Sequence, residues 1–305
     1  MNCLGFDTSN YTTSAALCGT AGIKSARRLL TVKQGERGLR QSDALFQHIK
    51  QMPEIVKELG SMDDICAVGV STRPRSVEGS YMPVFLGGVS VAETAAAVLN
   101  VPLYEFSHQD GHIMAGIHSA DAYELLEDDF ISVHLSGGTT EILKTCFNGN
   151  GFNVEIIGGT KDISAGQVID RVGVRLGMKF PCGAEMDRIS QTAESEIKLP
   201  VSLKDGFFNF SGLETKAATV ECDSDVLARS VFSAVSKTLT GALKFCCKSY
   251  NINKILFVGG VASNRYLRNE ICNEFGDYAF FASPEMSTDN ACGIALLTEL
   301  VHSRR

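Results

Sequence analysis

Two histidines four residues apart are the first candidates for chemistry in this chain. His108 and His112 lie in the stretch 107–112, which follows a short apolar run and leads into residues that suit a helix. On a helix, residues four apart share one face, so both imidazoles could point at one ion. Imidazole is the commonest protein ligand for zinc and iron. Two histidines do not complete a site, and the same pair could simply face solvent.

A carboxylate near the C-terminus offers the missing ligand. Asp289 lies in the stretch 287–290, just ahead of an expected C-terminal helix. Asp289 or Asn290 could be an ordinary N-cap of that helix. Alternatively, Asp289 joins His108 and His112 in a set of two histidines and one carboxylate. Such a set leaves coordination positions open, as iron(II) and catalytic zinc sites require.

Small and polar residues at the ends of expected strands suggest a site for a nucleotide. Gly259 and Gly260 follow an apolar strand at 254–258 and precede a helix that starts near Asn264, which is a good place for a nucleotide. A similar turn, 136–140, follows an expected strand at 130–135. At 8–11, hydroxyl and amide side chains at the tip of a hairpin offer donors to a phosphate, or form an ordinary turn.

Composition describes an ordinary globular protein in a reducing compartment. The chain has 305 residues, which suits two domains or one large one, and a formal net charge of −7. Its ten cysteines are scattered and form no C-x-x-C pair, which favours a reducing cytoplasm over a disulfide framework. The N-terminus predicts a first strand and not a signal peptide, and no apolar run is long enough to span a bilayer. We therefore expect a cytoplasmic protein with no membrane partner.

One strip departs from the acidic balance. Its basic residues are Lys24, Arg27, Arg28, Lys33, Arg37 and Arg40. The strip is either a solvated loop or strand edge, or a contact with a phosphate backbone.

Repeated patterns predict two similar halves. The hairpin expected at 3–18 returns as a second hairpin at 130–145, and the acidic stretch 120–129 separates them. We place lobes at 1–120 and 121–305, with the last helix, from about 288, able to pack back on the first lobe. Apolar spacing predicts helices at 42–59 and 224–250. Pro53 should kink or interrupt the first of these, and His48 on it should be a surface residue.

Seven motifs in this order resemble the TsaD/Gcp family of tRNA threonylcarbamoyladenosine transferases, also described as O-sialoglycoprotein endopeptidases of the M22 type. The family's G-[IF]-[ED]-T-S, H-x-x-x-H and S-G-G-H-T correspond to residues 5–9, 108–112 and 136–140. Its A-G-E-x-x-D-K and F-S-F-S-G-L-K-T correspond to 165–171 and 208–215. Its G-G-V-[AS]-[AS]-N-x-x-L-R and T-D-N correspond to 259–268 and 288–290. The resemblance covers essentially the whole chain.

The resemblance implies an α/β fold of the actin/sugar-kinase/Hsp70 (ASKHA) type, with two similar lobes and a nucleotide and metal cleft between them. It implies one divalent metal on His108, His112 and Asp289, either Fe²⁺ or Zn²⁺, with Mg²⁺ as an alternative. It implies Asp7 and Ser9 as catalytic candidates. The residues implied for an ATP-, ADP- or AMP-type nucleotide are Ser136, Gly137, Gly138, Asp170, Gly183, Gly259, Gly260 and Asn264.

The implied reaction moves a threonylcarbamoyl group from threonylcarbamoyl-AMP to N6 of the tRNA adenosine beside the anticodon, and releases AMP. The implied partners are a TsaB-like second subunit, a TsaE-like ATPase and the tRNA itself. Proteolysis lacks support, because the sequence has neither an H-E-x-x-H helix nor an obvious Ser/His/Asp arrangement.

Several positions depart from the family pattern and keep other functions open. Tyr11 and Thr12 stand where the family has an acidic pair, Thr139 replaces a histidine, and Glu214 replaces a lysine. These changes also suit a diverged paralogue with another acceptor or a regulatory or scaffold role. A small-molecule kinase of the same fold is a further alternative, in which Asp7 would supply the carboxylate that a kinase needs.

Overall fold

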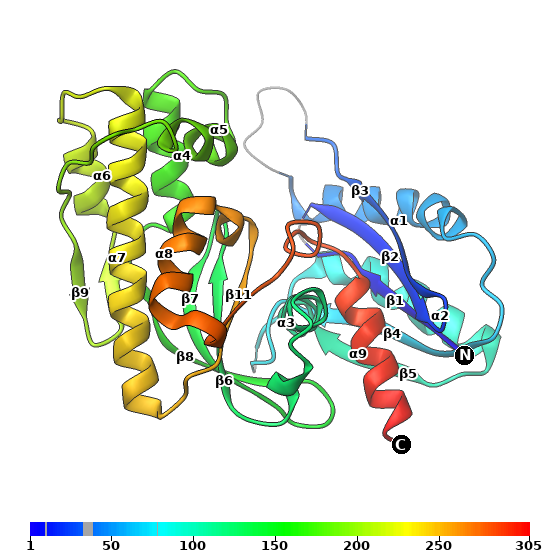
Figure 1. Ribbon diagram of the computed structural model, residues 1–305. Coiled ribbons are helices and arrows are strands. Elements are labelled where there is room, and N and C mark those ends of the chain that lie inside the picture. Colours follow the sequence, from blue (N-terminus) through cyan, green and yellow to red (C-terminus); the bar gives the residue numbers. More distant parts are fainter. Residues whose placement is uncertain (10, 33–38, 78) are drawn as a thin grey trace. The chain divides into compact units, whose positions relative to one another are not determined.

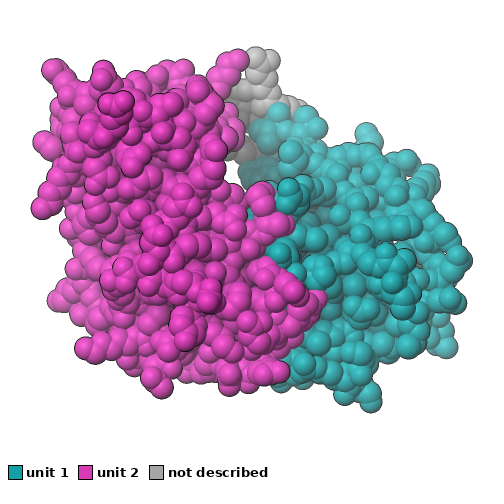
Figure 2. All heavy atoms as spheres, viewed as in Figure 1, with its two compact units in different colours: residues 1–119, 147–153, 285–305 teal, residues 120–146, 154–284 magenta. Residues whose placement is uncertain are grey.

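Two β-sheets organise the chain, each lying mainly within one of two structural units (Figure 1). The computed structural model describes residues 1–9, 11–32, 39–77 and 79–305. Unit 1 comprises 1–119, 147–153 and 285–305, and unit 2 comprises 120–146 and 154–284 (Figure 2). The chain therefore passes from one unit to the other after residues 119, 146, 153 and 284.

The sheet of unit 1 has the strand order β3-β2-β1-β4-β5. A hairpin of β1 (Asn2–Asp7) and β2 (Thr12–Gly19) continues into β3 (Gly22–Leu29), with antiparallel pairing throughout. On its other side β1 pairs in parallel with β4 (Ile65–Arg73), which pairs in parallel with β5 (Leu103–Ser107). Asp7 and Ser107 therefore lie at or near the carboxyl ends of parallel strands, where sites commonly form in α/β sheets.

The sheet of unit 2 repeats this order. Its strands are β6 (Phe130–Leu135), β7 (Thr140–Phe147), β8 (Phe152–Thr160), β9 (Ser202–Lys204), β10 (Phe207–Asn209), β11 (Ile255–Val258) and β12 (Ala279–Phe281). They run β12-β11-β6-β7-β8-β10-β9, so that β8-β7-β6-β11-β12 matches β3-β2-β1-β4-β5 with two short strands added. The repetition expected from the two hairpins is present in the topology.

The basic strip begins on β3, a strand that was not predicted from the sequence. Arg27 and Arg28 lie on the edge strand β3, where Arg27 donates to Thr288 Oγ1 and Arg28 pairs with Glu58. Lys33 and Arg37 lie outside the described residues.

The helices of unit 1 are α1 (Gln41–Glu58), the 3₁₀ turn η1 (Pro83–Phe85), α2 (Leu86–Leu99), α3 (His108–Ser119) and α9 (Cys292–Ser303). Helix α1 continues through Pro53. The expectation of a surface His48 was wrong, because His48 is fully buried with Nδ1 2.8 Å from Thr13 Oγ1 of β2. On the same helix, Phe46 and Ile49 are exposed.

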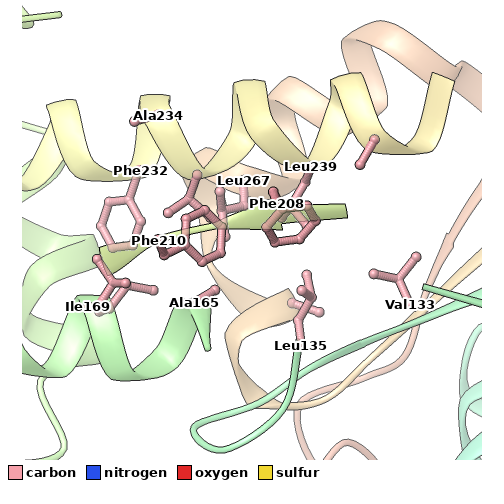
Figure 3. Packing of buried hydrophobic residues seen from close by; sticks show 14 of the residues in the cluster. Val133, Leu135, Ala165, Ile169, Phe208, Phe210, Phe232, Ala234, Leu239 and Leu267 are labelled. Carbon is pink, nitrogen blue, oxygen red and sulfur yellow. The ribbon is translucent and has the colours of Figure 1, made fainter. Parts of the chain in front are cut away.

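The helices of unit 2 surround a large aromatic core. They are the turn η2 (Tyr123–Leu126), α4 (Ala165–Arg175), α5 (Gly183–Ser190), α6 (Ser211–Ala217), α7 (Ser224–Tyr250), the turn η3 (Gly260–Ser263), α8 (Arg265–Phe275) and the turn η4 (Gly276–Tyr278). The predicted range of α7 is confirmed. Phe210 lies near Phe232 of α7, and Phe208 lies beneath Leu239 of the same helix (Figure 3). Each such buried side chain contributes about 1.5–3 kcal/mol, which fixes α4 and its polar edge in place.

Within the described residues, no helix combines the length and apolar character that crossing a bilayer would need.

Glycines let α9 lie against α3 and the sheet of unit 1 at very short range. A Cβ on Gly293 would lie 1.8 Å from the Gly111 carbonyl oxygen of α3, and one on Gly5 would lie 2.6 Å from Ala295 N. A Cβ on Gly69 of β4 would meet Thr298 Oγ1 at 1.8 Å. Glycine is required at these positions because the opposing atoms belong to backbone or to a buried side chain.

We expect Gly293→Ala to lower the free energy of unfolding by about 1–3 kcal/mol, since overpacking of this size forces packed elements apart. Denaturant titration measures the change. The matched control is Gly212→Ala on α6, where an added Cβ meets nothing within 4 Å. That control should be neutral or slightly more stable, because alanine favours helix. Equal stability of Gly293→Ala and the wild type would contradict the close-contact argument.

Candidate functional site

The start of α3 is fixed by a reciprocal pair of hydrogen bonds. Ser107 N donates to Asp110 Oδ2 at 2.8 Å, and Asp110 N donates to Ser107 Oγ at 3.1 Å. This is the capping-box arrangement, with aspartate in place of the usual glutamate. It makes His108 the first helical residue and puts His112 one turn later on the same face. Asp110 Oδ1 also accepts from Phe152 N at 3.1 Å, which holds the segment 147–153 to unit 1.

Asp289 lies against both histidines. Its Oδ1 is 3.6 Å from His108 Nε2 and 3.4 Å from His112 Nε2, and one ligand atom from each residue lies within 4.8 Å of the others. Asn290 Oδ1 accepts the Cys292 N–H at 2.9 Å at the start of α9. The neighbouring asparagine therefore supplies the cap, and the Asp289 carboxylate is left to face the imidazoles.

The spacing of these atoms fits a shared divalent ion. Bonds of about 2.1 Å from zinc or iron place neighbouring ligand atoms about 3.0–3.4 Å apart in octahedral or tetrahedral geometry. The two Nε2–Oδ1 separations are within a few tenths of an ångström of this range. Among the described residues, this is the one group of three or more histidine, cysteine or acidic side chains with such spacing.

A buried carboxylate orients the first imidazole from behind. His108 Nδ1 lies 3.2 Å from both carboxylate oxygens of Asp7, which is fully buried. Because a carboxylate can only accept, Nδ1 carries the hydrogen and Nε2 is directed to Asp289. Asp7 also accepts from Ser9 Oγ at 2.6 Å and from Ser71 Oγ. A histidine that binds a metal through one ring nitrogen usually donates the N–H of the other to a carboxylate, and His108 has this arrangement.

These contacts shift the ionisation of the cluster. Burial alone would lower the pKa of His108, but the charges of Asp7 and Asp289 outweigh it and raise that pKa to about 10. Burial would raise the pKa of Asp7 and of Asp289, but His108 holds both below their usual range, aided at Asp289 by His112. Without a metal ion the cluster therefore carries a proton on His108 between two carboxylates.

Unit 2 contains a separate cavity of about 430 Å³ at one end of its sheet. This volume suits a nucleotide-sized ligand. The lining residues are Gly137, Gly166, Ile169, Asp170, Pro181, Gly183, Ala184, Asp187, Phe232, Gly260, Val261, Ser263 and Asn264. Its walls combine apolar side chains with a few carboxylate, amide and hydroxyl groups, which is the usual composition of a small-ligand site.

The turn after β6 is held against the start of α4. Ser164 caps α4 in a capping box with Gln167, and its Oγ donates to the Gly137 carbonyl oxygen at 2.7 Å. A Cβ on Gly166 would lie 2.5 Å from Gly137 Cα, so that only glycine allows this approach. The same contact brings α4 and Asp170 beside the glycine turn.

Hydrogen bonds fix the polar groups of the cavity. Asp170 Oδ1 accepts from Cys182 N at 2.7 Å, which ties α4 to the loop before Gly183. Asn264 Oδ1 caps α8 by accepting from Leu267 N at 2.9 Å, while its Nδ2 donates to Asp187 Oδ1 at 3.0 Å. Asp187 was missed in the sequence analysis. Its place one helical turn after Gly183 was the available signal.

The predicted nucleotide residues occupy different places. Gly137, Asp170, Gly183, Gly260 and Asn264 line the cavity. The remaining three, Ser136, Gly138 and Gly259, do not line it.

Ser136 closes the turn by accepting from Thr139 N at 3.0 Å, with Gly138 between them. Gly259 has φ +99°, and a Cβ there would lie 2.3 Å from the Leu135 carbonyl oxygen. The geometry of Gly259 is thus explained by the packing of its turn against the end of β6.

Three side chains that depart from the family pattern are buried or make contacts with neighbouring residues. Thr12 is buried in β2, and the Tyr11 hydroxyl accepts from Leu39 N at 3.3 Å. Glu214 of α6 forms an ion pair with Arg171 of α4, with Oε2 and Nη1 3.0 Å apart. None of these three residues belongs to the histidine cluster or lines the cavity.

Comparison with known proteins gives the family. A family model described as tRNA N6-adenosine threonylcarbamoyltransferase matches residues 32–296. A protein of that name from Thermosipho melanesiensis is 30% identical over 312 residues, covering 96% of this chain and 92% of the relative. Another from Kosmotoga olearia is 34% identical over 247 residues, covering 77% and 72%.

A longer relative carries a second function in its name. The probable bifunctional tRNA threonylcarbamoyladenosine biosynthesis protein of Methanothermobacter thermautotrophicus is 28% identical over 320 residues, covering 100% of this chain and 57% of the relative.

Solved structures with low sequence identity share the fold. HypF from T. kodakarensis aligns with a TM-score of 0.62 at 10% identity, over 99% of this chain and 47% of that one. A ROK family glucokinase from Streptomyces griseus aligns with a TM-score of 0.54 at 11% identity, over 99% and 100%. These likenesses confirm the expected ASKHA fold. Together with the family match, they show that the chain belongs to the tRNA N6-adenosine threonylcarbamoyltransferase family, a family of transferases.

Proposed function

We propose that this protein transfers a threonylcarbamoyl group from threonylcarbamoyl-AMP to N6 of the tRNA adenosine adjacent to the anticodon. The observation that carries the proposal is the cluster of His108, His112 and Asp289, whose ligand atoms lie within 4.8 Å of one another in a chain of this family. The cavity of unit 2 adds a site of suitable size for the adenylate.

His108, His112 and Asp289 would hold one divalent ion. Two imidazoles favour Fe²⁺ or Zn²⁺ over Mg²⁺, which prefers oxygen ligands and keeps several waters. When bound, such an ion polarises a carbonyl oxygen of the transferred group. Asp7 and Ser9 would not contact the ion directly. Asp7 orients His108 through Nδ1, and Ser9 donates to Asp7, so their part is to position the ligand.

Different residues of the cavity would bind different parts of the adenylate. Asp170 keeps Oδ1 on Cys182 N, which leaves Oδ2 available to accept from ribose hydroxyls. Gly137 and Gly183 have open space where a Cβ would stand, so backbone N–H groups can approach a phosphate. Ile169, Phe232 and Val261 supply apolar surface for a base.

A kinase reaction is disfavoured by the state of Asp7. A kinase needs a carboxylate that reaches the acceptor hydroxyl or Mg²⁺. Asp7 is fully buried and already accepts from Ser9, Ser71 and His108. A diverged member with another acceptor or a scaffold role stays the second candidate, favoured by the charge reversal at Glu214.

The proposal includes a TsaB-like subunit and a TsaE-like ATPase as partners, in the cytoplasm. Support comes from exposed apolar side chains on neighbouring helices, Phe46 and Ile49 of α1 and Leu86 of α2. A Cβ on Gly87 of α2 would lie 3.9 Å from Ile49, so these side chains are close enough to form one surface. All ten cysteines are free thiols, which suits a reducing compartment.

Removing the imidazoles should remove the metal. We expect His112→Ala, alone or with His108→Ala, to yield protein that loses its metal during purification, since a lone histidine and carboxylate hold an ion poorly. The single variant leaves the Asp7–His108 pair intact and should keep the fold. Elemental analysis measures the metal. The control His302→Ala, whose Nδ1 faces the Tyr104 hydroxyl, should keep the metal. Wild-type stoichiometry in the double variant would refute the ligand assignment.

Filling the cavity should abolish nucleotide binding. ATP or AMP should raise the melting temperature of the wild type, because saturation at about 100 times Kd adds about 2.7 kcal/mol to the native state. We expect Gly183→Leu to lose this shift, since its side chain enters open space in the cavity. Gly212→Leu, equally open but outside the cavity, should keep it. Equal shifts in both variants would exclude this cavity as the nucleotide site.

The transfer itself can be followed by mass spectrometry of nucleosides. Wild-type protein and its partner subunits, mixed with threonylcarbamoyl-AMP and unmodified tRNA that reads ANN codons, should yield the modified adenosine. Asp7→Asn should reduce the rate about 10–100-fold, because it removes the carboxylate that orients His108. If no product forms while metal and adenylate stay bound, the protein is a diverged family member and the proposed reaction is wrong.

A further inference from the structure

A second recess adjoins the nucleotide cavity on the outer side of α4. It has a volume of about 510 Å³ and is lined by Gly137, Gln167, Asp170, Arg171, Val174 and Phe180. Gly137 and Asp170 border both hollows, so the recess and the nucleotide cavity share a wall. All of these residues belong to unit 2.

One wall of the recess is an exposed aromatic ring. Phe180 is 74% exposed and Val174 is 51% exposed, although burying a side chain of this size is worth about 1.5–3 kcal/mol. A single exposed apolar residue on a protein surface is ordinary. Here, however, the ring stands beside a hollow large enough for a nucleoside, and it is flanked by an aliphatic side chain. The pair offers a flat apolar platform to a planar group.

Arg171 lines the recess, and two more cations lie close to its lining residues in the sequence. Arg171 and Arg175 lie four residues apart on α4 and Lys179 follows in the next loop, and all three are exposed. The net charge of the whole chain is −7, yet three cations lie within nine residues of sequence here.

The acidic groups nearby are largely engaged. Asp170 accepts from Cys182 N, and Glu214 pairs with Arg171, while Glu185 is exposed on the first turn of α5. One carboxylate satisfies at most two of the five N–H donors of a guanidinium, so Arg171 is held in place and keeps donors for a ligand.

We propose that this recess binds an unpaired base of the tRNA anticodon loop, by stacking on Phe180 with Arg175 and Lys179 on the flanking phosphates. Unpaired bases recognised by proteins stack on aromatic side chains while basic residues follow the backbone. A duplex hides its bases and offers no such face. The inference rests on the proposed function, since tRNA as acceptor supplies the loop. The shared wall would bring that loop beside the adenylate.

Binding of a labelled RNA to the full-length protein tests the recess. The probe is a 17-nucleotide anticodon stem-loop, and Kd is measured by fluorescence anisotropy. We expect Phe180→Ala to weaken binding about tenfold or more, and Phe180→Tyr to bind as the wild type does. The matched control is Tyr278→Ala, another exposed aromatic of unit 2, which should leave Kd unchanged. Arg175→Gln with Lys179→Gln should reduce the salt slope by about 0.7 for each contact removed.

Several outcomes overturn the inference. It is wrong if the wild type does not bind the stem-loop, or if Phe180→Ala binds it as tightly as the wild type. It is also wrong if duplex RNA of equal length binds as well with the same dependence on Phe180. The ATP-induced shift in melting temperature should be unchanged in Phe180→Ala. Loss of that shift would mean that Phe180 shapes the nucleotide cavity.

The transfer assay separates this inference from the proposed function. Stem-loop binding that depends on Phe180, without any modified adenosine, rejects the reaction and supports the recess. Modified adenosine formed by Phe180→Ala with an unchanged KM for tRNA supports the reaction and rejects the recess.

Discussion

The candidate metal centre depends on a contact between two backbones. Asp289 lies three residues before α9, and the histidines lie on α3, so the approach of these helices sets the distance between ligands. A Cβ on Gly293 would stand 1.8 Å from the Gly111 carbonyl oxygen, so this crossing requires glycine at position 293. Ligand separations of 3.4–3.6 Å leave no room for the helices to move apart. The geometry of the candidate metal centre thus depends on Gly293, which is not one of its candidate ligands.

Electrostatic interactions explain how these charged groups are stable together without a metal ion. A fully buried carboxylate is costly unless it is bonded, and Asp7 is bonded to two hydroxyls and an imidazole. The raised pKa of His108, about 10 against an ordinary 6.5, means that its proton stabilises the metal-free fold. That contribution is complete below about pH 6.5 and is lost as the pH rises through about 10. A metal ion takes the place of this proton, so acid opposes metal binding.

Residue spacing predicted features that depend on one helix alone. It could not predict burial that depends on a segment distant in the sequence. His108 and His112 share a face because any helix places residues four apart together, and α7 follows from its apolar period. The burial of His48 could not be read from α1, because it depends on Thr13 of β2, whose hydroxyl lies 2.8 Å from its Nδ1. The role of Gly259 in binding a nucleotide stays a prediction, while its φ of +99° and its closeness to Leu135 reflect the packing of its turn. Both contacts depend on which strand lies next to which.

The departures from the family pattern gain a physical meaning from their neighbours. The family has lysine at both positions that are Arg171 and Glu214 in this chain, and two cations there would repel each other. Here the two side chains are 3.0 Å apart and form an ion pair. Because both are at least partly exposed, the pair adds little to stability. Its consequence is geometric, since Glu214 fixes the direction of a guanidinium at the edge of the recess beside Phe180. The change at Glu214 therefore acts on the surface next to the cavity of unit 2 and does not involve the candidate metal ligands.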